Sequence, residues 1–223
     1  MKKDTSGWSS IEQVTDVDTD QNGGLSIAVD LNDDIHLAWG GCNPNWYNCL
    51  YYRKKTSGVW GSQETINDSS STNISSYSAA ICVDSNNKPH VAWEAFNYTS
   101  SKSEVNHSVK NTSWQTQTVY DSSNSLTAVD ISLDTSDNIY IVWQDKKAGK
   151  LMLAKNDGTW GSAQVLVAFS NFISYSDNFA SLLWSTYPGN TNISSTGIAC
   201  LYVYPSSICL LYTSDAADEL DGV

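Results

Sequence analysis

Apolar and polar residues alternate along most of this chain, in short runs where every second residue is aliphatic or aromatic. Clusters of Asn, Asp, Gly and Ser separate these runs. Alternation with a period of two, together with β-branched and aromatic enrichment, predicts strands joined by turns. No segment shows a convincing 3.6-residue period, so the pattern predicts an all-β protein.

One pair of apolar runs occurs three times, at residues 25–39, 78–93 and 129–143. In each copy an Asp stands nine residues before a Trp, with an Asn/Asp-rich turn between the two runs. Three matches at one spacing indicate an internal repeat. We interpret the repeated Asp as a structural turn residue, because Asx side chains bond to their own backbone and tolerate left-handed conformations.

A second motif, a run that starts at a Trp, follows each copy and begins at Trp60, Trp114 and Trp160. Residues 8–14 repeat it from Trp8, so the four tryptophans are spaced by 52, 54 and 46 residues. Each unit therefore contains four expected strands: A before the turn, B ending at the first Trp, C, and D starting at the second Trp.

Four antiparallel strands repeated about every 40 to 50 residues are typical of a β-propeller blade. We expect strand D of a preceding blade at 8–14, blades at 25–66, 78–119 and 127–167, and the degenerate start of a further blade at 178–205. Because propellers usually have four to eight blades, residues 1–208 are expected to be an incomplete propeller.

The last fifteen residues have a different character. Residues 209–219 agree at all eleven positions with the translation of a transposase-type sequencing adaptor. We interpret 209–223 as a non-native tail; the alternative is a natural acidic tail. Removing its four acidic and no basic residues changes the net charge from −12 to −8.

The charge balance excludes some partners. Twelve Lys and Arg against 24 Asp and Glu disfavour a phosphate-neutralising surface, so no nucleic acid partner is expected. No apolar stretch approaches the roughly 18 residues of a membrane span, and polar residues follow the first three residues where a signal peptide would be apolar.

The His-Val-Ala-Trp strand at 90–93, which follows an Asn-rich turn, resembles the blades of BNR or sialidase-like propellers, and the resemblance extends over residues 8–167. It implies a propeller fold. A sialidase of this kind would need three arginines to hold the substrate carboxylate. The chain has one, Arg53, and cannot assemble that cluster.

Propeller connectivity places the D–A and B–C connections on one face, where we expect the longer loops at 15–24, 40–49, 67–77, 94–104 and 144–149. Loops on a rigid scaffold often carry function, and aromatic faces beside amides and carboxylates suit sugar rings. The candidate ligand-binding residues are Trp46, Tyr47, Glu94, Phe96, Tyr98, Gln144 and Asp145. Alternatively, the aromatics pack against neighbouring loops. Glu94 and Asp145 are also the nearest candidates for a glycosidase carboxylate pair.

Calcium is the one cofactor that the sequence suggests. Asp16, Asp18, Asp20 and Asn22 resemble the alternate oxygen ligands of a calcium loop. The loop is incomplete, because Gln21 stands where a calcium loop has Gly. A solvated loop between blades is the alternative.

Two cysteines, Cys42 and Cys49, bracket the first B–C loop, and a disulfide between them would fit an oxidising compartment; two free thiols are the alternative. His36 and His90 share one repeat position, which Tyr140 fills in the third copy. A packing role is therefore favoured over metal ligation.

These observations predict an extracellular or cell-surface binding module on a propeller scaffold, with a glycan or a protein surface as its ligand. One alternative is the non-catalytic part of a sialidase-like glycoside hydrolase. Another is a purely structural propeller.

Overall fold

The computed structural model describes residues 3–4, 7–8, 10–15, 24–168, 180–182, 200–204 and 207–211. Within these ranges the protein is almost entirely β, and no helix is long and apolar enough to cross a membrane.

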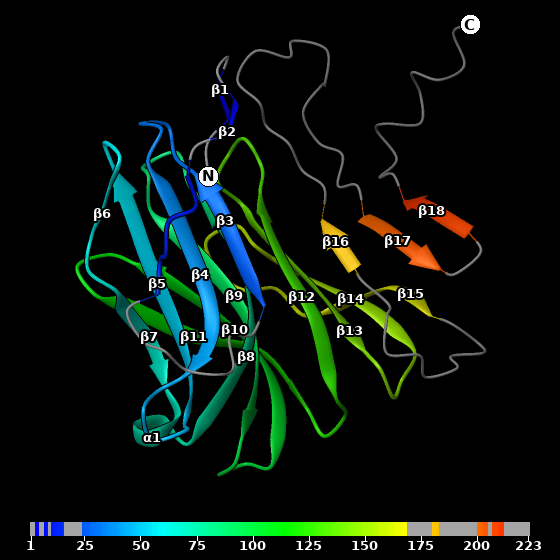
Figure 1. The fold of residues 1–223 in the computed structure, drawn as a ribbon. Coiled ribbons are helices and arrows are strands. Elements are labelled where there is room, and N and C mark those ends of the chain that lie inside the picture. Colours follow the sequence, from blue (N-terminus) through cyan, green and yellow to red (C-terminus); the bar gives the residue numbers. More distant parts are fainter. Residues whose placement is uncertain are drawn as a thin grey trace, which may run out of the picture.

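Three consecutive antiparallel sheets form the main body, which we call blades 1, 2 and 3 (Figure 1). Blade 1 comprises β3 (Leu25–Val29), β4 (Ile35–Cys42), β5 (Asn48–Thr56), β6 (Val59–Trp60) and β7 (Glu64–Asp68), with β6 and β7 both paired to β5. Blade 2 comprises β8 (Ile74–Val83), β9 (Pro89–Asn97), β10 (Lys102–Lys110) and β11 (Trp114–Ser122). Blade 3 comprises β12 (Leu126–Leu133), β13 (Ile139–Asp145), β14 (Lys150–Asn156) and β15 (Gln164–Ala168).

The first strands of the blades, β3, β8 and β12, contact one another in succession, so they are the innermost strands of the arc. A one-turn helix, α1 (Ser69–Thr72), connects blade 1 to blade 2. The predicted all-β class and incomplete propeller are confirmed.

A further sheet contains β16 (Ala180–Leu182), β17 (Cys200–Tyr204) and β18 (Ser207–Leu211), in that order. Strand β16 contacts β12 and β13 of blade 3. This sheet falls on the degenerate unit expected at 178–205, and β18 extends into residues 209–211. The non-native origin of residues 209–223 stays a prediction.

The N-terminal segment differs from the expected strand D at 8–14. Strand β2 (Gly7–Trp8) pairs with β1 (Lys3–Asp4), and residues 10–15 are not in a strand. The polar groups of blade 1 hold this segment instead: Arg53 donates to the carbonyl oxygen of Val14, and Glu12 Oε2 accepts from Lys55 Nζ at 2.5 Å and Trp60 Nε1 at 3.0 Å.

The contacts of Glu12 are repeated one blade further on. Glu64 accepts from Lys110 Nζ at 2.5 Å and from Trp114 Nε1 at 3.1 Å. Glu12 and Glu64 each stand four residues after the Trp of the second motif. Side chains of the N-terminal segment therefore contact blade 1 in the way that strand D of blade 1 contacts blade 2.

The repeated Asp closes the turn between the first two strands of each blade. Asp30 Oδ1 accepts from the backbone N–H groups of Asn32 and Asp34, both at 2.9 Å, and Asp33 takes a left-handed φ of 61°. Asp84 and Asp134 accept from the residues two and four positions on in the same way, and the third turn residues, Asn87 and Asp137, have φ values of 59° and 60°. The predicted structural role of the repeated Asp is confirmed.

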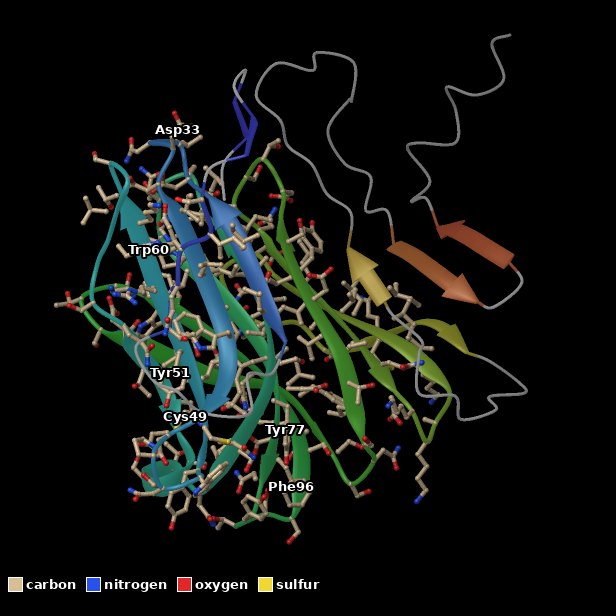
Figure 2. The ribbon with its side chains drawn as sticks, in the orientation of Figure 1. Asp33, Cys49, Tyr51, Trp60, Tyr77 and Phe96 are labelled. Atoms are coloured by element: carbon tan, nitrogen blue, oxygen red, sulfur yellow. The ribbon has the colours of Figure 1, made fainter. Side chains whose placement is uncertain are left out.

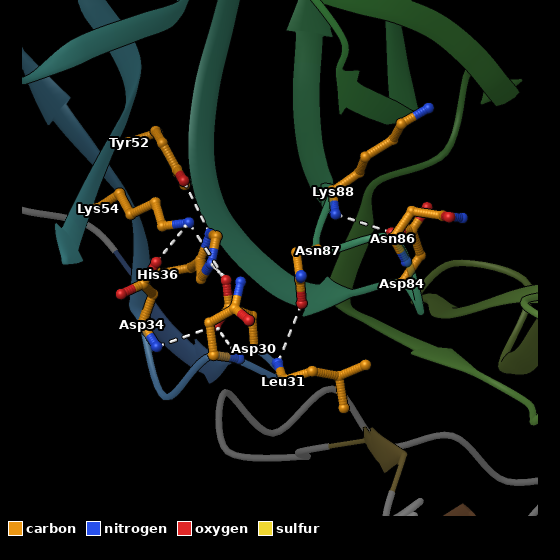
Figure 3. Close-up of polar contacts among 11 residues, drawn as sticks. Asp30, Leu31, Asp34, His36, Tyr52, Lys54, Asp84, Asn86, Asn87 and Lys88 are labelled. Carbon is orange, nitrogen blue, oxygen red and sulfur yellow. Dashed lines mark hydrogen bonds and ion pairs between the residues drawn. The ribbon is translucent and has the colours of Figure 1, made fainter. Parts of the chain in front are cut away.

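These turns also connect neighbouring blades (Figure 3). The left-handed Asn87 of blade 2 accepts, through Oδ1, from the backbone N–H of Leu31 in blade 1 at 3.1 Å. Asp137 of blade 3 accepts from the backbone N–H of Ser85 in blade 2 at 3.0 Å. One turn design thus closes a hairpin and fixes it to the preceding blade.

Apolar side chains fill both interfaces between blades. Because successive side chains of a strand point to opposite faces, the middle strand β9 is buried on both sides: Trp93 packs towards Leu50 and Tyr52 of blade 1, and Ala92 towards blade 3. The Trp of the second motif covers the preceding blade, with Trp114 edge-on to Tyr52 at 5.0 Å between ring centroids. Trp160 meets His107 likewise at 5.4 Å.

Buried histidines lie at the same interfaces. His36 Nδ1 lies 2.8 Å from Tyr52 Oη, and its Nε2 lies 3.1 Å from Asp30 Oδ2. In blade 2 the rings of His90 and His107 stack, with Nδ1 of the first 3.0 Å from Nε2 of the second. Burial lowers the pKa of His36 and His90, and that of His107 to about 3. These rings are therefore neutral packing elements at pH 7.

Replacing Asp84 with Ala should lower the free energy of unfolding by about 2 kcal/mol, because two turn N–H groups lose a charged acceptor. Asp84→Asn keeps an acceptor oxygen and should retain most of the stability. Urea unfolding of both variants measures the difference, and equal stabilities would contradict the assigned role.

Acid should destabilise the protein before its carboxylates titrate. An unfolded His has a pKa near 6.5, so the lowered pKa of His107 means that the folded state binds fewer protons. The stability is complete above pH 6.5 and falls as the pH drops, by about 2 kcal/mol at pH 5 for this residue alone. His107→Gln should reduce the loss between pH 7 and 5; an unchanged pH dependence would refute this.

Candidate functional site

Exposed aromatic side chains gather at one end of the blades. Among the described residues, the exposed large aromatics are Trp46, Tyr47, Tyr77 and Tyr98, with 66%, 48%, 43% and 53% of their surface accessible. All four belong to the β4–β5 and β9–β10 connections or the start of β8, the end opposite the Asp turns. Figure 2 shows Tyr77 and Phe96 at this end and Asp33 at the other. We call this the aromatic end.

A second version of the Asp turn displays Trp46. Asn43 Oδ1 accepts from the backbone N–H groups of Asn45 and Tyr47 at 3.0 and 3.1 Å, two and four positions on. Trp46 takes the left-handed position with φ of 64°. A bulky residue is rare in that conformation, and strained backbone of this kind concentrates at functional sites. Its indole is mostly accessible instead of packed.

A chain of hydrogen bonds connects this turn to blade 2. Asn48 Nδ2 donates to Ser75 Oγ at 3.3 Å, and Ser75 Oγ donates to Tyr98 Oη at 3.2 Å. The Tyr98 ring meets half-buried Phe96 edge-on, with centroids 5.1 Å apart. Tyr98 N–H donates to the carbonyl oxygen of Asn73 at 3.1 Å. Aromatic groups from two blades are therefore held on one connected framework.

The loops at this end are shorter than expected, because the strands continue into them. Strand β13 runs to Asp145, so Gln144 and Asp145 are only 3% and 4% exposed. Asp145 accepts from Asn124 Nδ2 at 3.0 Å and from the backbone N–H of Ala148 at 2.9 Å. Ladder and turn contacts therefore occupy these two residues, and we leave them out of the proposed ligand site.

Glu94, the repeat equivalent of Gln144, is half-buried at the interface of blades 2 and 3. Ser78 and the backbone of Ala128 act to lower the pKa of its carboxyl group, while Oε2 is buried with no hydrogen-bond partner. Burial outweighs these effects and raises the pKa of Glu94. A carboxyl group with a buried, unpaired oxygen is equipped to accept or donate a proton.

Tyr77 is a site residue that the sequence reasoning missed. The β8–β9 pairing shifts register between Ser76 and Ala79, and this bulge leaves Tyr77 accessible. Burial of its hydroxyl and the neighbouring Tyr98 raise the pKa of Tyr77, with a smaller contribution from Glu94. The sequence does show that Tyr77 is an aromatic residue in an expected D–A connection, which could have identified it as a candidate. The sequence pattern does not reveal the bulge that exposes it.

The expected Cys42–Cys49 disulfide is absent, and both thiols are free and buried. In the β4–β5 ladder Cys42 pairs with Asn48, and Cys49 pairs with Gly41. This register places the two side chains on opposite faces of the sheet. Cys42 Sγ donates to Asn48 Oδ1 and Cys49 Sγ to the carbonyl oxygen of Tyr47, both at 3.3 Å.

The expected calcium ligands lie outside the described residues; they are Asp16, Asp18, Asp20 and Asn22. Within the described residues, no group of three or more His, Cys, Asp or Glu side chains could hold a metal ion. Arg53 donates to the carbonyl oxygens of Gly61, at 2.7 Å, and Val14. Its guanidinium therefore fastens the N-terminal segment to blade 1.

No family model and no curated protein matches the chain. Among solved structures, it is similar to a protein of unknown function from Dyadobacter fermentans DSM 18053, with a TM-score of 0.64, 11% identity, and coverage of 95% of this chain and 65% of that one. It is also similar to the Hadza microbial sialidase Hz136, with a TM-score of 0.57, 9% identity, and coverage of 83% and 40%.

At these identities the similarities show the fold alone. The chain spans less than two thirds of the length of either structure.

Proposed function

We propose that this propeller is a glycan-binding module and that the ligand binds at the aromatic end. The observation that carries the proposal is the display of Trp46, a mostly exposed indole held in a left-handed backbone position by the Asn43 turn. If this turn served only to reverse the chain direction, Asn or Gly would be favoured at the left-handed position 46. A role of the indole in ligand binding explains why Trp occurs at a position that disfavours it.

The surroundings of Trp46 fit a sugar better than an apolar ligand. Sugars present C–H faces that stack on aromatic rings, and hydroxyl groups that need hydrogen-bond partners. Tyr47, Tyr77 and Tyr98 add accessible rings with hydroxyl groups, next to a polar framework of Asn and Ser side chains. The similarity to a sialidase supports a scaffold suited to carbohydrate chemistry. We place such a module outside the cell or on its surface.

Trp46→Asn tests the assignment because it separates stacking from folding. Asn suits the left-handed position, so the melting temperature should stay the same or rise. Loss of the stacking surface should weaken glycan binding about tenfold or more. Glycan-array screening, followed by calorimetric titration of the hits, measures both variants.

Val59→Asn is the matched control, because Val59 is 71% exposed at the start of β6, away from the β4–β5 connection. It should bind like the wild type. Unchanged glycan binding by Trp46→Asn would show that the glycan site does not lie at the aromatic end. Binding to a protein surface and to no glycan would show that the ligand is a protein.

Glycoside hydrolysis is a second candidate function, favoured by Glu94. Glu94 has a raised pKa and a buried, unpaired oxygen. A carboxyl group that keeps its proton to higher pH suits the general acid of glycoside hydrolysis.

Turnover of a chromogenic glycoside panel distinguishes this candidate from binding alone. A hydrolase should lose about a hundredfold or more of its rate in Glu94→Gln, because proton transfer contributes at least that much. Absence of turnover by the wild type, or turnover unaffected by Glu94→Gln, would reject the candidate.

A further inference from the structure

A separate groove lies between blades 1 and 2, beside the Asp turns. Its volume is about 470 Å³, within the range of pockets that hold small ligands. Strands β4 and β5 supply His36, Tyr52 and Lys54, while blade 2 supplies Asn87 and Lys88 from its Asp turn and Lys110 from the end of β10. Figure 3 shows Lys54, His36 and Tyr52 of blade 1 beside Asn87 and Lys88 of blade 2.

The side chains that line the groove are basic, although the whole chain is acidic. Acidic residues outnumber Lys and Arg by 24 to 12 in the sequence. Yet three lysines line the groove, and no Asp or Glu is found among the described residues that line it. Its floor is neutral, because burial lowers the pKa of His36 and raises that of Tyr52.

The three ammonium groups differ in how they are held. Lys54 Nζ pairs with Asp34 at 2.9 Å and Asp30 at 3.2 Å, behind the lining. Lys110 Nζ pairs with Glu64 and lies 5.3 Å from the centre of the Tyr52 ring. Lys88 is exposed and forms no ion pair with another described residue. Two fixed cations and one adaptable cation therefore surround the groove.

We propose that this groove binds the oxyanion of an acidic sugar, either a uronate carboxylate or a sulfate ester. Ammonium groups donate strong, charge-assisted hydrogen bonds to both kinds of oxygen. The net negative charge of the chain disfavours a dense polyanion such as nucleic acid, whereas a single oxyanion can be satisfied locally. The proposal that the oxyanion belongs to a sugar rests on the proposed glycan-binding function; the proposal that the groove binds an oxyanion does not.

Three ligands identify the chemistry by calorimetric titration at 150 mM salt, where the screening length of about 8 Å suppresses the field of distant charges. They are a trigalacturonate, its methyl ester and a sulfated disaccharide. The wild type should bind the trigalacturonate or the sulfated sugar, and should bind the uncharged ester about tenfold more weakly or not at all. Which acid binds identifies the oxyanion.

Lys88→Gln should weaken binding of the acidic sugar about tenfold, because it removes the ammonium group and leaves the backbone contact of residue 88 with Asp84 in place. Lys88→Arg should restore binding. Lys147→Gln is the matched control, because it removes one charge from the connection at the aromatic end.

Equal binding of acid and ester, no effect of Lys88→Gln, or no binding of either acid would overturn the groove assignment. Trp46→Asn separates this result from the proposed function, because it should weaken neutral glycans and leave the lysine-dependent binding unchanged. Lysine-dependent binding of an acid in a protein that binds no neutral glycan would support the groove and remove the aromatic site.

Discussion

The architecture depends on one repeated interaction, an Asx oxygen that accepts two backbone N–H groups from the turn that follows it. This interaction holds the third turn residue in a left-handed conformation. From that position Asn87 and Asp137 reach the turn of the preceding blade. The same turn thus closes the hairpin and contacts the preceding blade, and apolar side chains fill the interface between the two sheets. Lys54 and His36 help to keep the first of these carboxylates ionised: burial opposes ionisation, but their contacts and the turn N–H groups outweigh it and lower the pKa of Asp30 to about 2.

The turn serves different purposes at the two ends of the molecule. In the three Asp turns, the left-handed residues are Asp33, Asn87 and Asp137, and the last two bond to a neighbouring blade. At the aromatic end, Asn43 builds the same turn, but the left-handed residue is Trp46, which is mostly exposed. The fold therefore uses one local solution for assembly and, we propose, for ligand display.

The blade pattern could be predicted from the sequence because it is periodic. The Asp-to-Trp spacing identified the hairpins, and the shared position of His36 and His90 indicated buried packing residues. Features that depend on register could not be predicted this way. A shift of one residue separates Cys42 from Cys49, and a bulge exposes Tyr77. Gln144 and Asp145 are buried because β13 extends as far as Asp145. The length of this strand depends on its pairing with β12 and β14. The Lys54, Lys88 and Lys110 groove combines residues of two blades, and only their packing brings them together.

Amide hydrogen exchange, measured residue by residue by NMR, tests the central claim most directly. Leu31 and Ser85 lie on surface turns, where an unbonded amide would exchange at the rate of an unstructured peptide. If the turn network holds the blades together, both amides should be protected and should exchange as slowly as the β-ladder amides on either side. Exchange at the unprotected rate, with the neighbouring strands still protected, would show that the turns do not connect the blades.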